Sequence, residues 1–411
     1  MKVVIVSNAY PPHVAGGAEL VACYLAEGLA AGGCDVTVVT TCSRDEGTAD
    51  GVLNGVRVVR FFPNNLWWNF ERFATGDRRS LPAKLVWNLR DTWNRDTGRR
   101  LGAVLDSVKP DVVHTHNLKG MSPIVWHTIA RRGVPIIHTA HDYYLLCARG
   151  AMLRGDGTAC DRRCALCRVY GQYYAACARP IDLLCSPSRF VLERHLEHGV
   201  GERARSAVVP NGIPLTPRHR PARAKGEKLR ALFLGQLRRE KGVHVLLDAL
   251  AHLRDDVVVD IAGRGELQPQ VELAAGSRTG VTFHGYVAGA AKAALLDAAD
   301  VLLFPSIWSE NAPIAIAESL VSGMPVIGSD IGAIPEFVSD GVNGLLFRVG
   351  DPAALAQAVN SVAADAVLYE ALCAGATASA GRYTVDTMVD RYRRLYETLA
   401  PQHAAAVEAY G

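Results

Sequence analysis

Short, continuous runs of β-branched and apolar residues recur along this chain and alternate with segments of helical character. The first runs are Val3–Val6, Val36–Thr40 and Val56–Phe61, and the helix-like segment Ala18–Ala31 separates the first two. Strands that are apolar on both faces belong in sheets covered by helices on each side, and such sheets are predominantly parallel. The alternation therefore predicts an α/β fold built on parallel sheets.

The alternation is interrupted once and then restarts, which indicates two domains. Residues 214–230 read PLTPRHRPARAKGEKLR and show no hydrophobic periodicity, as expected of a linker. A chain of 411 residues is long enough for two hydrophobic cores. We expect an N-terminal parallel α/β domain at 1–213, a second one at 214–382, and a C-terminal helix at 383–411 that packs back towards the N-terminal domain and ends in a loose tail.

Composition excludes several classes of protein. Apolar residues make up 49% of the chain and the formal net charge is only +3, which gives no reason to expect a nucleic-acid partner. No apolar run approaches the roughly 20 residues of a membrane span. Met1 leads directly into the strand-like KVVIVS, without a secretory signal. We therefore expect a cytoplasmic protein whose ten cysteines are thiols or metal ligands rather than disulfides.

Polar and glycine residues gather where the predicted strands end. Ligands of parallel α/β sheets bind outside the carboxyl ends of the strands, so two such edges facing each other would form a binding cleft. Gly16 and Gly17 lack the GxGxxG spacing of a dinucleotide fingerprint, which argues against a nicotinamide cofactor. The residues at the predicted strand ends are Ser7, Asn8, Gly16, Gly17, His114, His116, His138, His141, Gly235, Arg238, Lys241, Gly263, Gly285, Ser309 and Glu310.

The segment 235–242, GQLRREKG, lies between a predicted strand and a predicted helix. Its glycine lets the backbone approach a ligand, and Arg238 and Lys241 place positive charge where the helix begins. It is not a P-loop, because the GxxxxGK[ST] spacing is absent. The alternative interpretation is a basic turn with solvated side chains.

Residues 304–347 contain two glutamates eight positions apart, Glu310 and Glu318, on either side of a helix start at Pro313. Pro313 fits the first turn of a helix, and the free N–H groups after it form an anion site. Eight helical residues rise about 12 Å, which is too far for a hydrolase acid pair, so binding roles fit better. Two solvated surface acids are the alternative.

Four cysteines fall within 21 residues with the spacing C-x12-C-x3-C-x2-C, in a Gly- and Arg-rich insertion at about 147–170. Four thiolates can form a structural zinc site that orders such a loop, and they could less favourably hold an iron–sulfur cluster. Four unrelated thiols are the alternative. The four residues are Cys147, Cys160, Cys164 and Cys167.

The segment Phe61–Arg100 interleaves aromatic and basic residues. Such a segment can rest on an anionic membrane surface or bind a phosphorylated acceptor. A helical excursion that packs its aromatic side chains on the domain is the favoured interpretation. The aromatic residues concerned are Trp67, Trp68, Phe70, Phe73, Trp87 and Trp93.

Taken in order, the motifs of the whole chain resemble those of the family 4 retaining glycosyltransferases. They are SNAYPPHVAGGAE at the start, DVVHTH, VPNGI, GQLRREKG, AGRG, FHGYV, and SENAPIAIAE, which matches the family's E-x7-E signature at Glu310 and Glu318. The resemblance implies the GT-B fold, with two facing Rossmann-like domains. It covers nearly all of the chain except the cysteine insertion, which belongs to no general family pattern.

The resemblance implies a role for each matching residue. Lys241 would bind the donor diphosphate with Arg238, since the family's usual arginine position holds Gln236 here. Glu318 would bind the ribose, Glu310 the sugar hydroxyls, and His116 the transferred sugar. The implied catalytic residues are therefore His116, Arg238, Lys241 and Glu310. The implied donor-binding residues are Gly16, Gly17, Gly235, Arg238, Lys241, Gly263, Tyr286, Val287, Asn311, Ala312, Pro313, Ile314 and Glu318.

The implied activity is a retaining, metal-independent transfer of a hexose from a UDP- or GDP-sugar. The implied acceptor is a saccharide, a lipid-linked molecule or a natural product in a surface-glycan or related pathway. No cofactor is implied for catalysis, and a peripheral contact of the N-terminal domain with the inner face of the membrane is left open. The alternatives are a sugar-nucleotide epimerase, a phosphorylase with a lysine-bound pyridoxal cofactor, and a non-catalytic subunit that binds nucleotide sugar.

Overall fold

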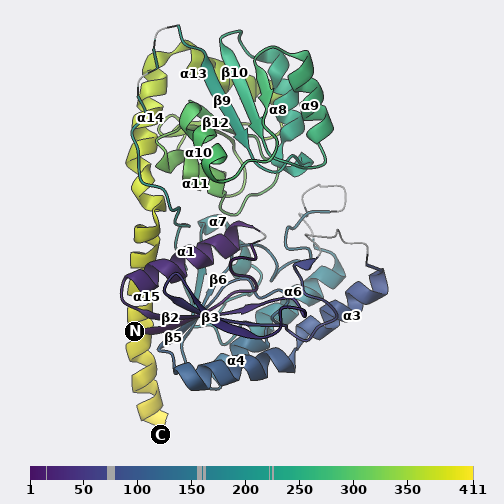
Figure 1. The fold of residues 1–411 in the computed structure, drawn as a ribbon, viewed down its shortest axis with the longest axis vertical. Helices are drawn as coiled ribbons and strands as arrows, with labels where there is room; N and C mark the ends of the chain where they lie inside the picture. Colours follow the sequence, from purple (N-terminus) through teal and green to yellow (C-terminus); the bar gives the residue numbers. More distant parts are fainter. Residues whose placement is uncertain are drawn as a thin grey trace. The chain divides into compact units, whose positions relative to one another are not determined.

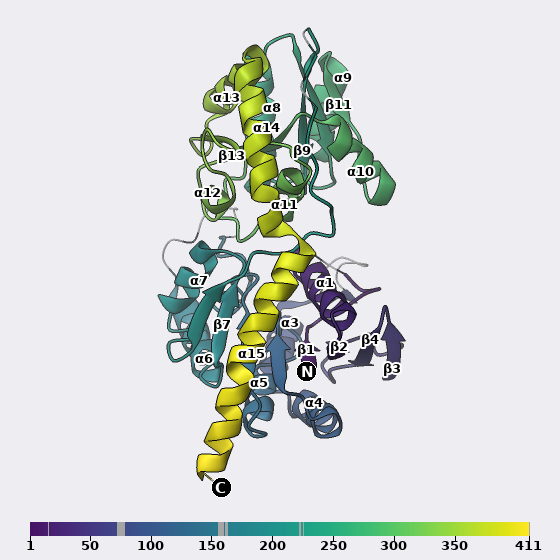
Figure 2. The ribbon, with the colours of Figure 1, turned by 90° about the vertical axis from the view of Figure 1, so that its left-hand side faces the viewer.

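The computed structural model describes residues 1–14, 16–71, 79–154, 160, 163–221, 223–224 and 226–410. The chain forms two compact units (Figure 1, Figure 2). Unit 1 comprises Met1–Met152, Asp161–Gly212 and Val385–Gly411, and unit 2 consists mainly of Ile213–Thr384. Each unit contains its own β-sheet.

Unit 1 is built on an eight-stranded sheet with the order β3-β4-β2-β1-β5-β6-β7-β8. All neighbours pair in parallel except β3 and β4, which are antiparallel. The edge strand β3 reads ADGVL and is mostly exposed, so it carries no apolar run that would predict it. The strands are β1 (Lys2–Val6), β2 (Asp35–Thr41), β3 (Ala49–Leu53), β4 (Val56–Phe61), β5 (Val112–Thr115), β6 (Ile136–Thr139), β7 (Leu183–Ser186) and β8 (Arg205–Val208).

Helices cover both faces of this sheet, because its central strands are buried on each side. Helices α1 (Gly17–Ala31) and α4 (Arg95–Val108) lie on opposite faces (Figure 1). Among the described residues, the other helices of unit 1 are α3 (Leu81–Thr92), α5 (Ile124–Ala130), α6 (Ala165–Cys177), α7 (Arg189–Leu196) and α15 (Val385–Tyr410).

The C-terminal helix α15 contacts α1 and β5 (Figure 2). Its buried face includes Tyr392 and Tyr396, whose hydroxyl groups lie 2.9 Å from Thr139 Oγ1 and 2.7 Å from His114 Nδ1. The expected loose tail is wrong, because the helix continues to Tyr410. The residues after Leu399 include three consecutive alanines, which are strong helix formers and favour continuation of the helix.

Unit 2 contains a six-stranded parallel sheet with the order β11-β10-β9-β12-β13-β14. Its helices include α8 (Val243–Ala249), α9 (Gln268–Ser277), α10 (Gly289–Ala298), α11 (Ile314–Val321), α12 (Ile334–Phe337), α13 (Pro352–Ala364) and α14 (Ala366–Ala380). The strands are β9 (Leu229–Leu234), β10 (Val257–Ala262), β11 (Val281–Phe283), β12 (Val301–Phe304), β13 (Val326–Ser329) and β14 (Gly344–Phe347).

The segment before β9, expected to be a linker, is attached to unit 2 by an arginine. The Arg220 guanidinium donates to the carbonyl oxygens of Asp297 at 3.0 Å and Ser322 at 3.2 Å, and also to those of Leu296 and Ala299. Five N–H groups in a planar fork allow one guanidinium to satisfy several carbonyls at once. The lack of periodicity in this segment therefore reflects anchoring by side chains rather than by regular structure.

The aromatic residues of 61–100 are mostly part of the core, as the favoured interpretation holds. Trp68, Phe70 and Trp87 are buried, whereas Trp93 is 43% exposed. Phe73 lies outside the described residues. Trp87 belongs to α3, where it shares the inner face with the buried carboxyl group of Asp91.

Asp91 makes the stability of unit 1 depend on pH. Burial raises the pKa of Asp91 to about 7, although its Oδ2 accepts a hydrogen bond from the Gly120 N–H at 3.0 Å. A raised carboxyl pKa means that the neutral form stabilises the folded state below the unfolded pKa of about 4. This stabilisation is lost as the pH rises through about 7.

We expect Asp91→Asn to remove this dependence. Between about pH 4 and pH 8 the unfolding free energy of the variant should rise relative to wild type by roughly 2–4 kcal/mol. Denaturation followed by tryptophan fluorescence reports on unit 1, which holds five of the six tryptophans. Asp106→Asn is the control. Its unfolding free energy should fall relative to wild type as the pH rises, because Arg132 holds the pKa of Asp106 below its usual value. A pH-independent difference between Asp91→Asn and wild type would contradict this account.

Candidate functional site

The candidate residues of unit 2 lie where its strand order reverses. From β9 the chain crosses to β10 on one side, whereas from β12 it crosses to β13 on the other. In parallel α/β sheets such a reversal is the usual place for a ligand, at the carboxyl ends of the two neighbouring strands, which here are β9 and β12. Lys241 follows β9 and Glu310 follows β12, so the topology brings these two side chains together.

Lys241 and Glu310 form an ion pair at this position. Lys241 Nζ lies 2.6 Å from Glu310 Oε1, and the Ser306 hydroxyl donates to the same oxygen at 2.8 Å. Glu310 is 4% exposed, so its charge is compensated by these two donors. Lys241 Nζ also lies 5.0 Å from the centre of the Trp308 ring. The ammonium group is thus held by a carboxylate on one side and an aromatic ring beside it.

Two glycines allow the loops around Lys241 to approach each other. Gly242 has φ +70°, and a Cβ there would lie 1.7 Å from the Pro305 carbonyl oxygen. Gly263 has φ +151°, and its Cβ would lie 1.8 Å from the Gly235 carbonyl oxygen. Both positions combine a backbone conformation that favours glycine with a contact that admits no side chain. The loops after β9, β10 and β12 are therefore packed backbone to backbone.

Glu318 is paired separately from Glu310. It belongs to α11, and its Oε1 lies 2.6 Å from Lys292 Nζ on α10. Pro313 directly precedes the first helical residue, Ile314, and no side chain caps this helix. The first N–H groups of α11 follow the loop that carries Glu310, Asn311 and Ala312. Helix α11 thus presents an anion-binding N-terminus next to this loop.

The other expected donor residues of unit 2 lie near the same sheet edge. Arg238 is more than half exposed and its guanidinium is 3.5 Å from the Glu240 carboxylate. Tyr286 is 66% exposed, and the Arg264 guanidinium lies 4.8 Å from the centre of its ring. Val287 follows Tyr286 and is half-buried. Arg264 follows β10 and Tyr286 follows β11, so neighbouring strands place this pair.

Unit 1 has its own reversal of strand order, between β1 and β5. Asn8 follows β1 and His116 follows β5, and the Asn8 N–H donates to the Asn117 carbonyl at 2.9 Å. His116 is 1% exposed, and its Nδ1 lies 2.8 Å from His141 Nε2. Its Nε2 is buried and has no hydrogen-bond partner among the described residues. It is thus a buried polar atom left without a partner in that part of the chain, beside the strand-order reversal where ligands of parallel sheets bind.

The histidines at this edge are uncharged at neutral pH. Burial lowers the pKa of His141 to about 4 and that of His116 well below its usual value. His114 and His138 show the same effect of burial on their pKa values. Neutral imidazole donates from one ring nitrogen and accepts at the other. His116 is therefore a neutral hydrogen-bonding group at this sheet edge.

Gly16 and Gly17 begin helix α1, with Gly16 as its N-terminal cap residue in extended conformation. Glu19 in the first turn is buried, and burial raises the pKa of its carboxyl group. Burial also raises the pKa of Asp142, which follows His141, to about 6, with a smaller contribution from the charge of Glu19. Two carboxyl groups within electrostatic reach of each other therefore accompany the histidines of unit 1.

The expected metal site is not supported by the structure. All four cysteines are described, yet no three His, Cys, Asp or Glu side chains in the described part of the chain form a group that could hold a metal ion. Cys147 is buried in the loop after β6, whereas Cys164 caps helix α6 and accepts from the Cys167 N–H at 3.5 Å. The two nearest cysteines of the motif thus meet at the start of α6, through a hydrogen bond from the Cys167 N–H to Cys164 Sγ.

Several residues of the site belong to no sequence motif. Ser306 and Trp308 lie within four residues of the end of β12, so the strand-end rule that selected Glu310 could have found them. Asp142 could have been found in the same way after β6. No sequence pattern marks Lys292, because it lies within α10 and reaches Glu318 only when α10 and α11 are brought together in the folded domain.

Comparison with known proteins identifies the family. Residues 16–212 match the model of the glycosyl transferase 4-like domain, and residues 228–365 match that of the glycosyl transferases group 1. The D-inositol 3-phosphate glycosyltransferase of Geodermatophilus obscurus is 31% identical over 72% of this chain and 68% of its own. The chain belongs to the family 4 glycosyltransferases. Its resemblance to this family and its GT-B class, with two Rossmann-like parallel-sheet domains, are thereby confirmed.

Two further similarities bear on this family 4 glycosyltransferase. The phosphatidyl-myo-inositol mannosyltransferase of Mycobacterium leprae is 37% identical over 41% of this chain and 46% of its own. The structure of Anabaena HepE in complex with UDP-glucose superposes with a TM-score of 0.67, covering 97% of this chain and all of that one at 18% identity. No helix in the described part of the glycosyltransferase is both long enough and apolar enough to cross a membrane.

Proposed function

We propose that this glycosyltransferase transfers a hexose, with retention of configuration and without a catalytic metal, from a UDP- or GDP-sugar. The acceptor is a saccharide, a lipid-linked molecule or a natural product, and the N-terminal unit contacts the membrane surface peripherally. The observation that carries the donor assignment is the Lys241 ammonium, held by Glu310 at the strand-order reversal of unit 2. UDP-glucose in HepE and the lipid substrate named for the mycobacterial relative are consistent with this proposal.

The main requirement of the reaction is to stabilise the negative charge that develops on the leaving phosphate. The bond between the anomeric carbon and the phosphate oxygen breaks with its electron pair on the phosphate. The acceptor oxygen forms the new bond on the same face, and its proton passes to the departing phosphate oxygen. Lys241, Arg238 and the N–H groups at the start of α11 supply fixed positive charge for that phosphate, the role a metal ion fills elsewhere.

The remaining roles follow the family pattern. In unit 2, Glu318 binds the ribose hydroxyls. Tyr286 and Val287 lie beside the nucleotide base, and Glu310 and Asn311 lie beside the transferred sugar. In unit 1, Gly16 and Gly17 admit close approach of a phosphate, and His116 binds a sugar hydroxyl through Nε2. Gly235 and Gly263 bring the loops after β9 and β10 together at the edge where the donor binds.

A thermal-shift panel of sugar nucleotides tests the donor assignment. A ligand at about 100 times its Kd stabilises the folded state by roughly 2.7 kcal/mol, so one UDP- or GDP-sugar should raise the melting temperature clearly. Conversion of that sugar nucleotide without acceptor would instead show an epimerase, and visible absorbance of a bound pyridoxal would show a phosphorylase. Binding without transfer to any saccharide or lipid-linked acceptor would favour a non-catalytic subunit. A panel with no stabilising sugar nucleotide would contradict the proposal.

A further inference from the structure

The inner face of helix α3 packs against the rest of unit 1. Trp87 is 4% exposed, its ring stacks on Trp67 with centres 6.1 Å apart, and its Nε1 donates to the Trp67 carbonyl at 2.8 Å. Asp91, one turn later, accepts from the Gly120 N–H. These contacts fix which side of α3 faces the domain.

The opposite face of α3 is also apolar, but it faces solvent. Leu81, Leu85 and Leu89 are 81%, 62% and 62% exposed, and their four-residue spacing places them in one row along the helix. Val86 and Trp93 are exposed beside this row. No other described helix carries more than two large exposed apolar residues, and scattered ones are ordinary for a protein surface. We call the row of three leucines with Val86 and Trp93 the α3 leucine face.

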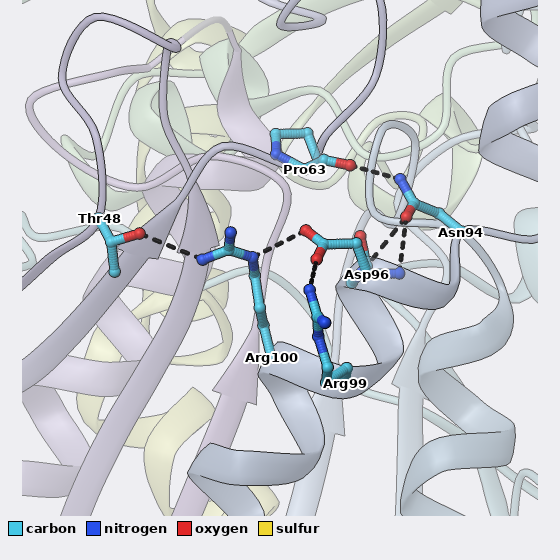
Figure 3. Close-up of polar contacts among 7 residues, drawn as sticks. Thr48, Pro63, Asn94, Asp96, Arg99 and Arg100 are labelled. Carbon is cyan, nitrogen blue, oxygen red and sulfur yellow. Dashed lines mark hydrogen bonds and ion pairs between the residues drawn. The ribbon is translucent and has the colours of Figure 1, made fainter.

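The charges on α3 and in the turn after it are predominantly positive. Residues 81–95 contain three basic residues, Lys84, Arg90 and Arg95, and one acid, Asp91, which is buried. The next acid along the chain, Asp96, pairs with Arg99 and, at 2.8 Å, with Arg100 (Figure 3). Arg90 and Arg95 are exposed. The α3 leucine face therefore has a basic border with its carboxylates neutralised.

We propose that the α3 leucine face is a docking surface for an anionic lipid membrane. An interfacial helix buries its apolar row at the boundary between headgroups and acyl chains, while flanking lysine and arginine side chains meet lipid phosphates. An interface with another protein chain would also bury leucines, but it would give no reason for the basic border. The proposal deepens the membrane contact included in the proposed function and in that respect rests on it, but its test requires no sugar transfer.

Vesicle co-sedimentation of the full chain tests the proposal. Wild type should bind vesicles of phosphatidylglycerol and phosphatidylcholine in equal parts, and bind much less to phosphatidylcholine alone or at high salt. Replacing two exposed leucines, Leu85→Ser with Leu89→Ser, should weaken binding to the mixed vesicles by at least about tenfold. The fold should persist, because neither side chain belongs to the core, and unchanged tryptophan fluorescence and melting temperature would verify this.

Leu273→Ser with Val367→Ser is the matched control, since these side chains are 73% and 77% exposed in unit 2. This control should bind vesicles as wild type does. Equal loss in both double variants, no binding by wild type, or no preference for anionic vesicles would overturn the proposal. A wild-type dimer in light scattering that Leu85→Ser with Leu89→Ser dissociates would instead assign the α3 leucine face to a second copy of the chain. Because vesicle binding and donor-induced thermal shifts are separate readouts, the membrane contact and the donor assignment can each fail alone.

Discussion

Lys241→Ala is expected to lower the rate of sugar transfer by roughly 10²–10³-fold, the usual effect of removing one preorganised group that stabilises developing negative charge. The ammonium group is held 2.6 Å from Glu310 Oε1, so its position is set before any donor binds. Steady-state transfer with the donor found by thermal shift measures the effect. Most of the loss should appear in kcat, because the charge on the phosphate grows only as the bond to the sugar breaks.

A loss of folding must be separated from a loss of chemistry. Removing Lys241 leaves the buried Glu310 carboxylate without its cationic partner, which destabilises a protein by about 3–5 kcal/mol when the charge is fully buried. Adding Glu310→Gln to Lys241→Ala should restore most of the melting temperature but none of the transfer. Lys228→Ala is the control, since Lys228 is an exposed lysine before β9. Transfer by Lys241→Ala within a few-fold of wild type would refute the assigned role.

Strand-end reasoning predicted much of this fold and selected the two residues that form the central ion pair of the site. The residues Val3–Val6 and Val301–Phe304 are apolar on both faces, so they could only be central strands, and the residues that follow them had to lie at the binding edge. Lys241 and Glu310 were selected in this way from the loops after two strands. That those strands are neighbours, and that the side chains touch, depends on strand order, which the periodicity of single strands does not encode.

The failures have physical reasons of the same kind. Lys292 reaches Glu318 from another helix, and no spacing along the sequence marks a contact that tertiary packing creates. Strand β3 pairs through its backbone at an exposed edge, where no apolar side chains are required. The cysteine spacing is compatible with a metal, but the described side chains form no group that could hold one. Spacing along the sequence does not show whether a long loop folds so that its thiols meet at one point.

Glu318→Ala is expected to abolish discrimination between ribose and deoxyribose in the donor. A hydrogen bond between a sugar hydroxyl and a carboxylate contributes about 1.5–3 kcal/mol, so 2′-deoxy or 3′-deoxy UDP or GDP should bind wild type roughly 10–150-fold more weakly than the parent nucleotide. In Glu318→Ala the parent and deoxy nucleotides should bind equally, both as weakly as the deoxy form binds wild type. Isothermal titration calorimetry measures all four affinities and closes the double-mutant cycle.

The pairing of Glu318 with Lys292 makes a second variant informative. The two side chains lie 2.6 Å apart, so Lys292 orients the carboxylate from α10. If Lys292 acts through Glu318, Lys292→Ala should weaken binding of the parent nucleotide more than that of the deoxy form, but less than Glu318→Ala does. Glu272→Ala on α9 serves as the control for loss of a carboxylate from this unit. Continued preference of Glu318→Ala for ribonucleotides would place ribose recognition on another group.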